Sequence, residues 1–331
     1  LLLSMLSPQW SAALSVAWVV LAQGVCGVAK DLTKTASKSA IKLTAGDASG
    51  TLFKWVAWFT GSKNAMKGVG FFLGGLLLDR LGFQGALWTM AALLALVFAG
   101  VVGFVPPLMG KSRASKSVRE LFAKNRGINL LAAARVALFG ARDVWFVVGI
   151  PVYFQAVLSD GTAEGRREAF FLIGSFLALW IIAYGAVQAA APRLLGARTQ
   201  PEEAMTAKAI LWASLLVPIP FALAAAALLA GGPSAALTAT LIAGLLVFGF
   251  VFAINSSVHS YLILAFGSAE RITRDVGFYY MANAAGRLIG TLLSGLSYQA
   301  GGLPLCLATA GAMALASWLA AMRSPSENQA R

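Results

Sequence analysis

The sequence predicts an all-α membrane protein, and three observations support this. Of the 331 residues, 59% are hydrophobic and only 12% are charged, about half the charged share of a typical soluble domain. The mean hydropathy is +0.76. The apolar residues also gather in runs long enough to cross a bilayer, which takes about 20 residues of helix. A soluble core could not bury so much apolar surface, so we expect a polytopic protein.

Nine apolar segments follow one another along the chain. Residues 1–6 resemble the end of a further segment, and the chain starts on LLLSML without an initiator Met. We therefore expect a longer natural N-terminus. The nine predicted spans are 9–29, 52–78, 85–106, 128–158, 169–191, 206–230, 235–266, 274–299 and 303–322.

The loops between these segments differ in charge. The longest loop, 107–127, carries six Lys/Arg and one Glu, and basic loops stay in the cytoplasm. Counted by alternation, the loops on its side hold 17 Lys/Arg, whereas the opposite loops hold only Arg80, Arg166 and Arg167. We therefore expect the central loop and the C-terminus to be cytoplasmic. The net charge of +13 reflects these loops first and an anionic ligand second.

An internal repeat predicts the architecture. The segment NAMKGVGFFLGGLLLDRLG (64–82) matches AAGRLIGTLLSGLSYQAGG (284–302) at an offset of 220 residues. The matched positions include Lys67 with Arg287, Gly70 with Gly290, Gly75 with Gly295 and Gly82 with Gly302. The two segments lie six spans apart and run in the same direction. This is typical of two pseudo-symmetric six-helix bundles related by an axis along the membrane normal, as in the major facilitator fold.

The repeat also predicts the domains. The first bundle is expected to lack roughly 90 residues, so that about nine of twelve spans are present. Residues 1–106 would be the remainder of the N-terminal bundle, with the end of span 3 and spans 4 to 6. Residues 107–127 would be a basic cytoplasmic linker, 128–322 the C-terminal bundle with spans 7 to 12, and 323–331 a cytoplasmic tail.

Charged residues inside the spans predict the ligand. Each costs about 2.5–3.5 kcal/mol on insertion scales, so such residues mark functional sites. The predicted spans hold five deep cations and one comparably deep acid, which favours an anion in a central cavity. These residues are Lys63, Lys67, Arg135, Arg142 and Arg287, with Asp143 as the acid. The alternative is that residues outside this sequence supply matching carboxylates.

Polar residues on spans 10 and 11 extend this hypothesis. Span 11 carries a stripe at helical spacing that includes Tyr280, Asn283 and Arg287. Span 10 carries Asn255 and His259 in its inner half. We expect these side chains to add hydrogen bonds to a bound anion. A lone histidine is more often an ordinary hydrogen-bonded residue than a proton carrier.

A ladder of basic residues follows the first full span. Lysine recurs every fourth residue in AKDLTKTASKSAIK (29–42), which stacks like charges on one helical face. Lys30, Asp31 and Lys34 lie nearest the membrane and are expected to form the cytoplasmic mouth through which an anion enters. Asp31 and Asp143 are also candidate proton carriers. For Asp143, neutralisation of an arginine is the favoured role.

Five long strings resemble one transporter family. VAKDLTKTASKSAIKL, FKWVAWFTGSKNAMKGVGFFLGGLLL, ARDVWFVVGIPV, FAINSSVHSYLILAF and DVGFYYMANAAGRLIGTLLSGLSYQ are similar to the organoarsenical efflux permeases (ArsJ) of the major facilitator superfamily. The resemblance runs from about residue 20 to residue 300. It implies export of 1-arseno-3-phosphoglycerate, which glyceraldehyde-3-phosphate dehydrogenase makes when arsenate replaces phosphate. It also implies a monomer in the bacterial cytoplasmic membrane and arsenate resistance.

Other functions remain open. A carrier of another organic anion or an organophosphate fits the same charges, whereas a carrier of cationic drugs would need more intramembrane acids. A membrane-embedded transferase would need a base, a nucleophile or a metal cluster, and the sequence offers no paired carboxylates and one histidine. Cys26 and Cys306 are far apart in apolar segments, so neither a disulfide nor a metal is expected. We expect no cofactor, no nucleic acid and no enzyme activity, with membrane lipid as the surrounding partner.

Overall fold

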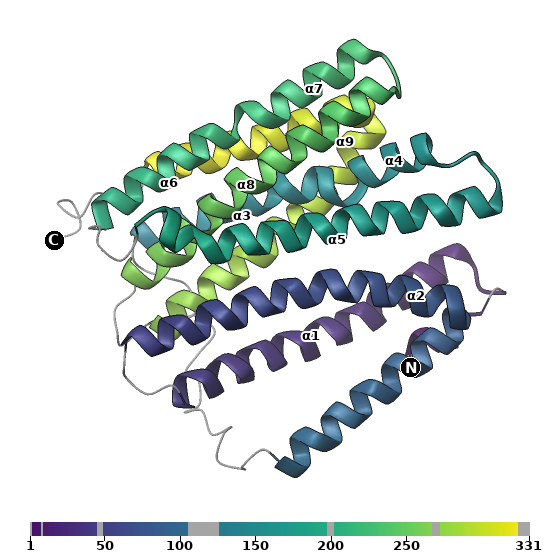
Figure 1. Ribbon diagram of the computed structural model, residues 1–331, viewed down its shortest axis with the longest axis horizontal. Coiled ribbons are helices and arrows are strands. Elements are labelled where there is room, and N and C mark those ends of the chain that lie inside the picture. Colours follow the sequence, from purple (N-terminus) through teal and green to yellow (C-terminus); the bar gives the residue numbers. More distant parts are fainter. Residues whose placement is uncertain are drawn as a thin grey trace. The chain divides into compact units, whose positions relative to one another are not determined.

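The computed structural model describes residues 2–7, 9–44, 49–104, 126–196, 202–266 and 272–323, and every regular element within them is helical. Side chains are left undescribed at residues 31, 34–44, 49–65, 71, 163, 192, 202, 263–266 and 272–276. The chain divides into two compact units, residues 1–115 and 116–331 (Figure 1). The predicted linker 107–127 lies outside the described residues except for its last two positions, and so does the predicted tail except for Arg323.

The first unit contains three elements. A 3-10 turn, η1 (Leu2–Met5), precedes α1 (Ala12–Thr44) and α2 (Ser49–Phe104). Trp18 Nε1 donates to the Leu2 carbonyl at 2.7 Å, and Gln84 Nε2 donates to the Ser4 carbonyl at 2.8 Å. Within residues 1–6, expected as the end of a span, Leu2–Met5 thus form a short turn that bonds to α1 and α2.

The second unit begins with one long helix of mixed geometry. It runs as α3 (Arg126–Val144), a π-helical turn η3 (Trp145–Gly149) and α4 (Ile150–Leu158). Next come α5 (Ala163–Leu194), α6 (Glu202–Leu216), α7 (Pro218–Ala230) and α8 (Ala235–Phe266). The unit ends with α9 (Ile272–Met322). Pro218 separates α6 from α7 because proline has no N–H to continue the helical ladder.

The long helices confirm a multi-pass membrane protein. Among the described residues, seven helices are long and apolar enough to cross a membrane. Two of them, Met66–Phe104 and Gly277–Met322, contain a break, at Gly82 and at Gly301–Gly302. Figure 1 shows that α2 changes direction along its length. Gly82 lies between the predicted spans 52–78 and 85–106, and Gly301–Gly302 lies between 274–299 and 303–322.

The two breaks occupy matched positions of the internal repeat. Gly82 has φ of 65° and Gly302 has φ of 64°. This left-handed region is open to glycine at no steric cost, whereas other residues are strained there. The repeat pairs these two glycines at the offset of 220, so matched residues turn the chain in both units.

The core of the second unit is aromatic. Trp145 on η3 is fully buried, with ring centroids 5.3 Å from Trp180 on α5 and 5.5 Å from Phe248 on α8. Its neighbours Phe139 and Phe252 stand 5.2 Å apart, edge to face. Such pairs contribute about 0.5–1.5 kcal/mol beyond area burial. The core therefore joins α3, α5 and α8 at the level of the π-turn.

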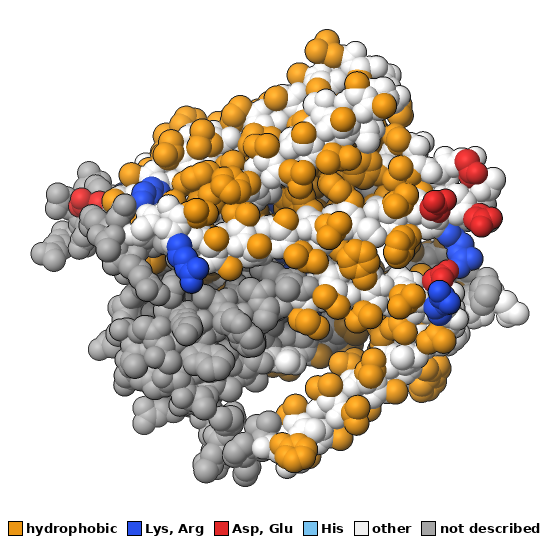
Figure 2. Space-filling model, in the orientation of Figure 1, with side chains coloured by type: hydrophobic (Ala, Val, Ile, Leu, Met, Phe, Trp, Pro, Cys, Tyr) orange, Lys and Arg blue, Asp and Glu red, His pale blue; other side chains and the backbone are white. Residues whose placement is uncertain are grey.

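The surface is apolar along the sides of the helices. Figure 2 shows hydrophobic side chains covering α6, α7 and α8, with charged side chains near the helix ends. Leu228 and Leu229 near the end of α7 are 70% and 87% exposed. Water would disfavour so large an apolar surface, whereas lipid accepts it. The surface therefore agrees with a membrane environment for this unit.

Candidate functional site

The most strongly charged site in the second unit joins one acid to two arginines. The buried Asp143 carboxylate accepts from Arg142, with Nε to Oδ1 at 2.6 Å. Its other oxygen, Oδ2, lies 3.0 Å from Arg287 Nε. The Asp143 side chain is 2% exposed, that of Arg142 is 14% exposed and that of Arg287 is 55% exposed. We call these three residues the Asp143 cluster.

Small residues bring α3 and α9 together at this cluster. A Cβ on Gly290 would lie 2.7 Å from the Gly140 carbonyl oxygen, and one on Gly286 would lie 2.8 Å from Val136 Cα. Both distances are shorter than real contacts, so only glycine permits this approach. Closely spaced small residues let membrane helices approach at their backbones. Because Arg287 follows Gly286 directly, the packing places Arg287 beside Asp143.

A π-helical turn lies immediately after the Asp143 cluster. The Ile150 N–H donates to the Trp145 carbonyl, five residues back. Two side chains of α9 hold this turn: Ser294 Oγ accepts from the Val148 N–H at 3.1 Å, and Cys306 Sγ donates to the Val144 carbonyl at 3.0 Å. Single π turns inside α-helices are frequent at functional sites.

A second charged site lies between α3, α8 and α9. Arg135 is 6% exposed, and its guanidinium donates to the Ser256 carbonyl at 3.0 Å and to Ser256 Oγ at 3.1 Å. The guanidinium carbon also lies 4.5 Å from the Tyr279 ring centroid. Asn255 and His259 on α8 are fully buried. We call Arg135, Asn255, Ser256, His259 and Tyr279 the Arg135 cluster.

The two clusters share one aromatic ring. The guanidinium carbons of Arg135 and Arg142 lie 4.1 Å and 5.0 Å from the Phe139 ring centroid. The two charges are therefore no farther apart than the sum of these distances. Cations over aromatic faces gain about 0.5–2 kcal/mol. Asp143 is the one carboxylate that pairs with these arginines among the described residues, so this part of the unit carries an excess of positive charge.

The predicted stripe on span 11 divides between two environments. Tyr280 is 44% exposed, and Arg287 and Thr291 are exposed as well. Ser294 is fully buried because it bonds the π-turn, and Asn283 is half-buried. The part of the stripe from Tyr280 to Thr291 thus lies mainly at the surface of the unit, whereas Ser294 lies against the π-turn.

The remaining predicted site residues belong to the first unit. Lys30 and Lys67 have exposed side chains. The side chains of Asp31, Lys34 and Lys63 lie outside the described residues, although all three positions are helical. Their roles in an entrance or a cavity stay predictions.

Three features escaped the sequence analysis. The π-turn has no signal in the hydrophobic pattern, and the contacts of Ser294 and Cys306 with it depend on α9 lying against α3. The third feature is Tyr279, because the predicted stripe runs through its neighbour Tyr280 instead. A stripe through Tyr279 and Asn283 also has helical spacing, so the pattern alone could not choose between the two tyrosines.

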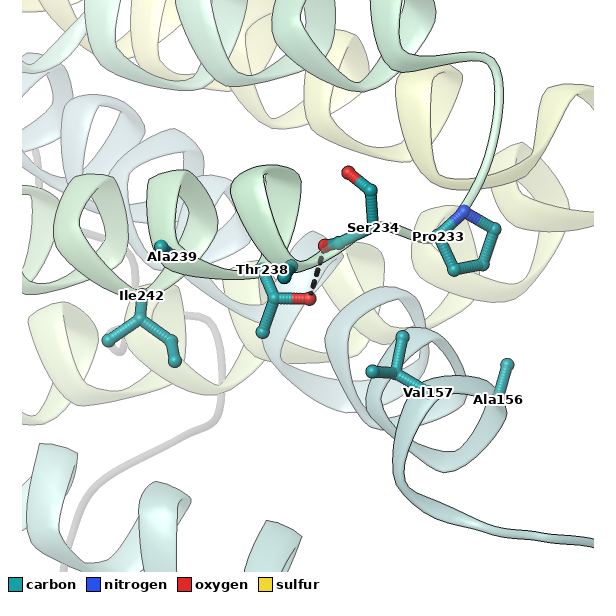
Figure 3. Close-up of a pocket in the computed structure, with 8 residues that line it drawn as sticks. Ala156, Val157, Pro233, Ser234, Thr238, Ala239 and Ile242 are labelled. Carbon is teal, nitrogen blue, oxygen red and sulfur yellow. Dashed lines mark hydrogen bonds between the residues drawn. The ribbon is translucent and has the colours of Figure 1, made fainter.

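A separate groove lies near the end of α4. It has a volume of about 560 Å³ and lies between α4 and the start of α8, where Thr238 Oγ1 donates to the Ser234 carbonyl at 2.8 Å (Figure 3). Its lining is Ala156, Val157, Pro233, Ser234, Ala235, Thr238, Ala239 and Ile242. Because none of these residues is charged, the groove has no means of binding an anion by charge.

No family model, no curated protein and no solved structure matches this chain. The ligand class is therefore inferred from the geometry of the Asp143 and Arg135 clusters. Arginine presents several donors in a planar fork that fits phosphate-like oxyanions. With more arginines than carboxylates, the two clusters have the charge and the donors to hold a multiply charged oxyanion.

Proposed function

We propose that this protein is an efflux transporter for an organic oxyanion, and specifically for 1-arseno-3-phosphoglycerate. The observation that carries the proposal is the excess of arginine over carboxylate in the described part of the second unit, where Arg135 is buried and Arg142 is half-buried. Arg135, Arg142 and Arg287 are opposed there by Asp143 alone among the described residues. A buried positive charge without a matching carboxylate is unfavourable unless an anion accompanies it.

The identity of the substrate rests on the five strings that resemble the organoarsenical permeases. The ester would come from glyceraldehyde-3-phosphate dehydrogenase acting with arsenate, and its export would confer arsenate resistance. The chemistry is compatible, because both ends of the ester are phosphate-like groups. Arginines bind such groups through two parallel hydrogen bonds. Arsenic in this ester needs no thiol ligand.

The transport cycle is proposed as alternating access between two bundles. The ester would enter from the cytoplasm past Lys30, Asp31 and Lys34. Arg142 and Arg287 would hold it, together with Arg135 and the predicted cations Lys63 and Lys67. Tyr280, Asn283, Asn255 and His259 would add hydrogen bonds. The two bundles would then rock about the bound ester in the bacterial cytoplasmic membrane, with the central linker and the C-terminus inside the cell. No chemical step is required.

We assign Asp143 to positioning rather than to proton transfer. Its carboxylate bridges Arg142 and Arg287 through separate oxygens. In that place it orients both guanidinium groups and reduces their mutual repulsion. The exposed side chain of Arg287 keeps donors available to a ligand. Asp31 stays the other candidate for proton coupling.

The test uses arsenic-sensitive bacterial cells that express the complete gene. Arsenate resistance is measured with and without co-expressed glyceraldehyde-3-phosphate dehydrogenase, for the wild type, Arg287→Gln and the control Arg126→Gln. Arg126 is an exposed arginine at the start of the same helix as Asp143. We expect resistance that requires the dehydrogenase, is lost in Arg287→Gln and persists in Arg126→Gln.

Other outcomes would redirect the proposal. Resistance without the dehydrogenase would indicate a different arsenical. Uptake or export of an organophosphate without any arsenate resistance would favour the alternative, a carrier of another organic anion, which the same arginines fit. Equal loss of membrane-inserted protein and of resistance in Arg287→Gln would assign Arg287 to folding instead of to substrate binding.

A further inference from the structure

Arg135 is a buried cation that has no counter-charge among the described residues. Its guanidinium bonds both oxygens of Ser256 through one nitrogen, whereas Nε is buried and has no hydrogen-bond partner. Among the described residues no carboxylate lies within ion-pair distance of it; the one buried acid, Asp143, pairs with Arg142 and Arg287. Burial of an unpaired charge is among the most unfavourable arrangements in a folded protein. The described partners of the guanidinium, Ser256 and the rings of Phe139 and Tyr279, carry no opposite charge.

The polar side chains beside Arg135 are also unsatisfied. Both amide atoms of Asn255 and both ring nitrogens of His259 are buried without a hydrogen-bond partner in the described part of the chain. Native proteins leave few buried polar atoms unpaired, and each such atom calls for an explanation. Here four of them lie on two neighbouring residues of one helix.

The face of α8 that carries these atoms points toward α3. Phe252 contacts Phe139 of α3, and Ser256 accepts from Arg135 of α3. Asn255 and His259 follow Phe252 by three and seven residues, which places them on the same helical face. The unsatisfied atoms of Asn255 and His259 therefore lie on the same face of α8 as Ser256, the residue that Arg135 contacts.

We propose that the Arg135 cluster is a second anion subsite, separate from the Asp143 cluster, that binds one compact oxyanion group such as phosphate. Arg135, Asn255 and His259 each have N–H donors for such a group. Water would satisfy the hydrogen bonds but leave the charge uncompensated. An oxyanion supplies both the acceptors and the opposite charge.

The spacing of the two subsites selects a substrate class. Arg135 and Arg142 lie against the same ring of Phe139, at 4.1 Å and 5.0 Å. A short organic molecule with an oxyanion group at each end would engage Arg135 with one end and the Asp143 cluster with the other. This part of the inference rests on the proposed function, whose ester is two-headed. The binding of free phosphate at Arg135 does not rest on it.

The experiment measures binding to the purified full-length protein in lipid nanodiscs at constant ionic strength. The probes are inorganic phosphate, with one head, and 2,3-bisphosphoglycerate, with two. The variants are Arg135→Gln, Arg135→Lys and Arg287→Gln, with Arg126→Gln as the matched control. Affinity is read by calorimetry and by the probe-dependent rise in melting temperature.

The expected pattern distinguishes the two subsites. Arg135→Gln should weaken a phosphate site by about ten- to hundredfold, as loss of a charged donor does, and Arg135→Lys should restore part of it. Arg287→Gln should leave that site unchanged. The two-headed probe should lose affinity in both Gln variants. Identical phosphate affinity in the wild type and Arg135→Gln would overturn the proposal.

Asn255→Leu and His259→Phe cover the case in which Arg135→Gln fails to fold. If the unsatisfied atoms serve a ligand, these apolar variants should melt at or above the wild-type temperature without phosphate and lose the phosphate-dependent rise. A lower melting temperature with an undiminished phosphate response would show a structural role and overturn the proposal. Phosphate binding at Arg135 in a protein that confers no arsenate resistance would sustain the subsite and refute the proposed function; the reverse would refute the subsite alone.

Discussion

Residues 64–82 and 284–302 match in sequence but differ in what surrounds them. Gly290 lies against the backbone of α3, where a Cβ would come within 2.7 Å of the Gly140 carbonyl oxygen. At the matched Gly70, a Cβ would meet no atom within 4 Å among the described residues. Arg287, whose side chain is itself exposed, pairs with the buried Asp143 of α3, and the matched Lys67 is an exposed cation on α2 of the first unit.

One property is nevertheless the same in both segments. Gly82 and Gly302 end them with φ angles of 65° and 64°. The break is thus local to the glycine, because it depends on the absence of a Cβ. The roles of Gly290 and Arg287 depend on a second helix. The comparison teaches that a repeated pattern fixes the backbone course, while the partner helix decides what each side chain does.

The largest effect is expected at Asp143, the acid on α3 that pairs with Arg287 of the second segment. Asp143→Asn would leave the half-buried Arg142 and the exposed Arg287 without their shared counter-charge. Breaking a fully buried pair destabilises by about 3–5 kcal/mol, and solvent screening of the exposed Arg287 side chain places this variant toward or below the lower end of that range. Thermal unfolding in nanodiscs measures it, with Arg126→Gln as an exposed control whose effect should stay within about 0.5 kcal/mol. A loss of stability as small as that of Arg126→Gln would show that the Asp143 cluster does not stabilise the fold. Its ion pairs would then not distinguish the two segments.

The second largest difference in stability is expected when leucine replaces the matched glycines Gly70 and Gly290. Gly290→Leu forces α9 away from the α3 backbone, and overpacking of this kind costs about 1–3 kcal/mol or more. Gly70→Leu enters open space and should change the melting temperature little. Gly100→Leu, also in open space, is the matched control. Equal destabilisation by Gly290→Leu and Gly70→Leu would show that α2 is packed as tightly as α9.

Alanine at the two breaks should act alike. Gly82→Ala and Gly302→Ala each place a Cβ at a positive φ with an extended ψ, a combination adopted essentially by glycine alone, at about 1–3 kcal/mol. Because the strain is local, the two variants should lower the melting temperature by similar amounts despite their different surroundings. A much larger loss for one of them would mean that packing, and not the φ angle, makes that glycine necessary.

The smallest effect concerns the loop between α4 and α5, outside both segments. Asp160 Oδ1 accepts from the Thr162 hydroxyl at 2.6 Å and from the Thr162 N–H at 2.9 Å. These bonds, the hydroxyl first, hold the pKa of Asp160 below its ordinary value. A lowered folded-state pKa adds stability above the ordinary pKa of about 3.9 and loses it as the pH falls through the lower value.

Titration of Asp160 by NMR would test this, together with melting curves of the wild type and Asp160→Asn between about pH 5 and pH 3. The difference between the two proteins should be small at the upper pH and should shrink as the pH falls. A difference that grows with acidification would contradict a lowered pKa for Asp160. The loop then serves as a baseline for effects that involve no buried charge.

Much of the architecture follows from the sequence alone. The sequence predicts the all-helical fold with its long apolar helices and the match of Gly82 with Gly302. These features depend on hydropathy, on local backbone sterics and on charge, which are properties of a residue and its near neighbours.

Tertiary structure alone decided the pairings. Asp143 meets Arg287 across 144 positions, and Ser294 bonds the backbone of a π-turn that no pattern marks. It also placed Tyr279, and not Tyr280, against Arg135. The physical reason is that these contacts need two helices to approach at a particular rotation. Helical periodicity identifies the face of one helix, but the partner of that face is set by packing between segments far apart in the chain.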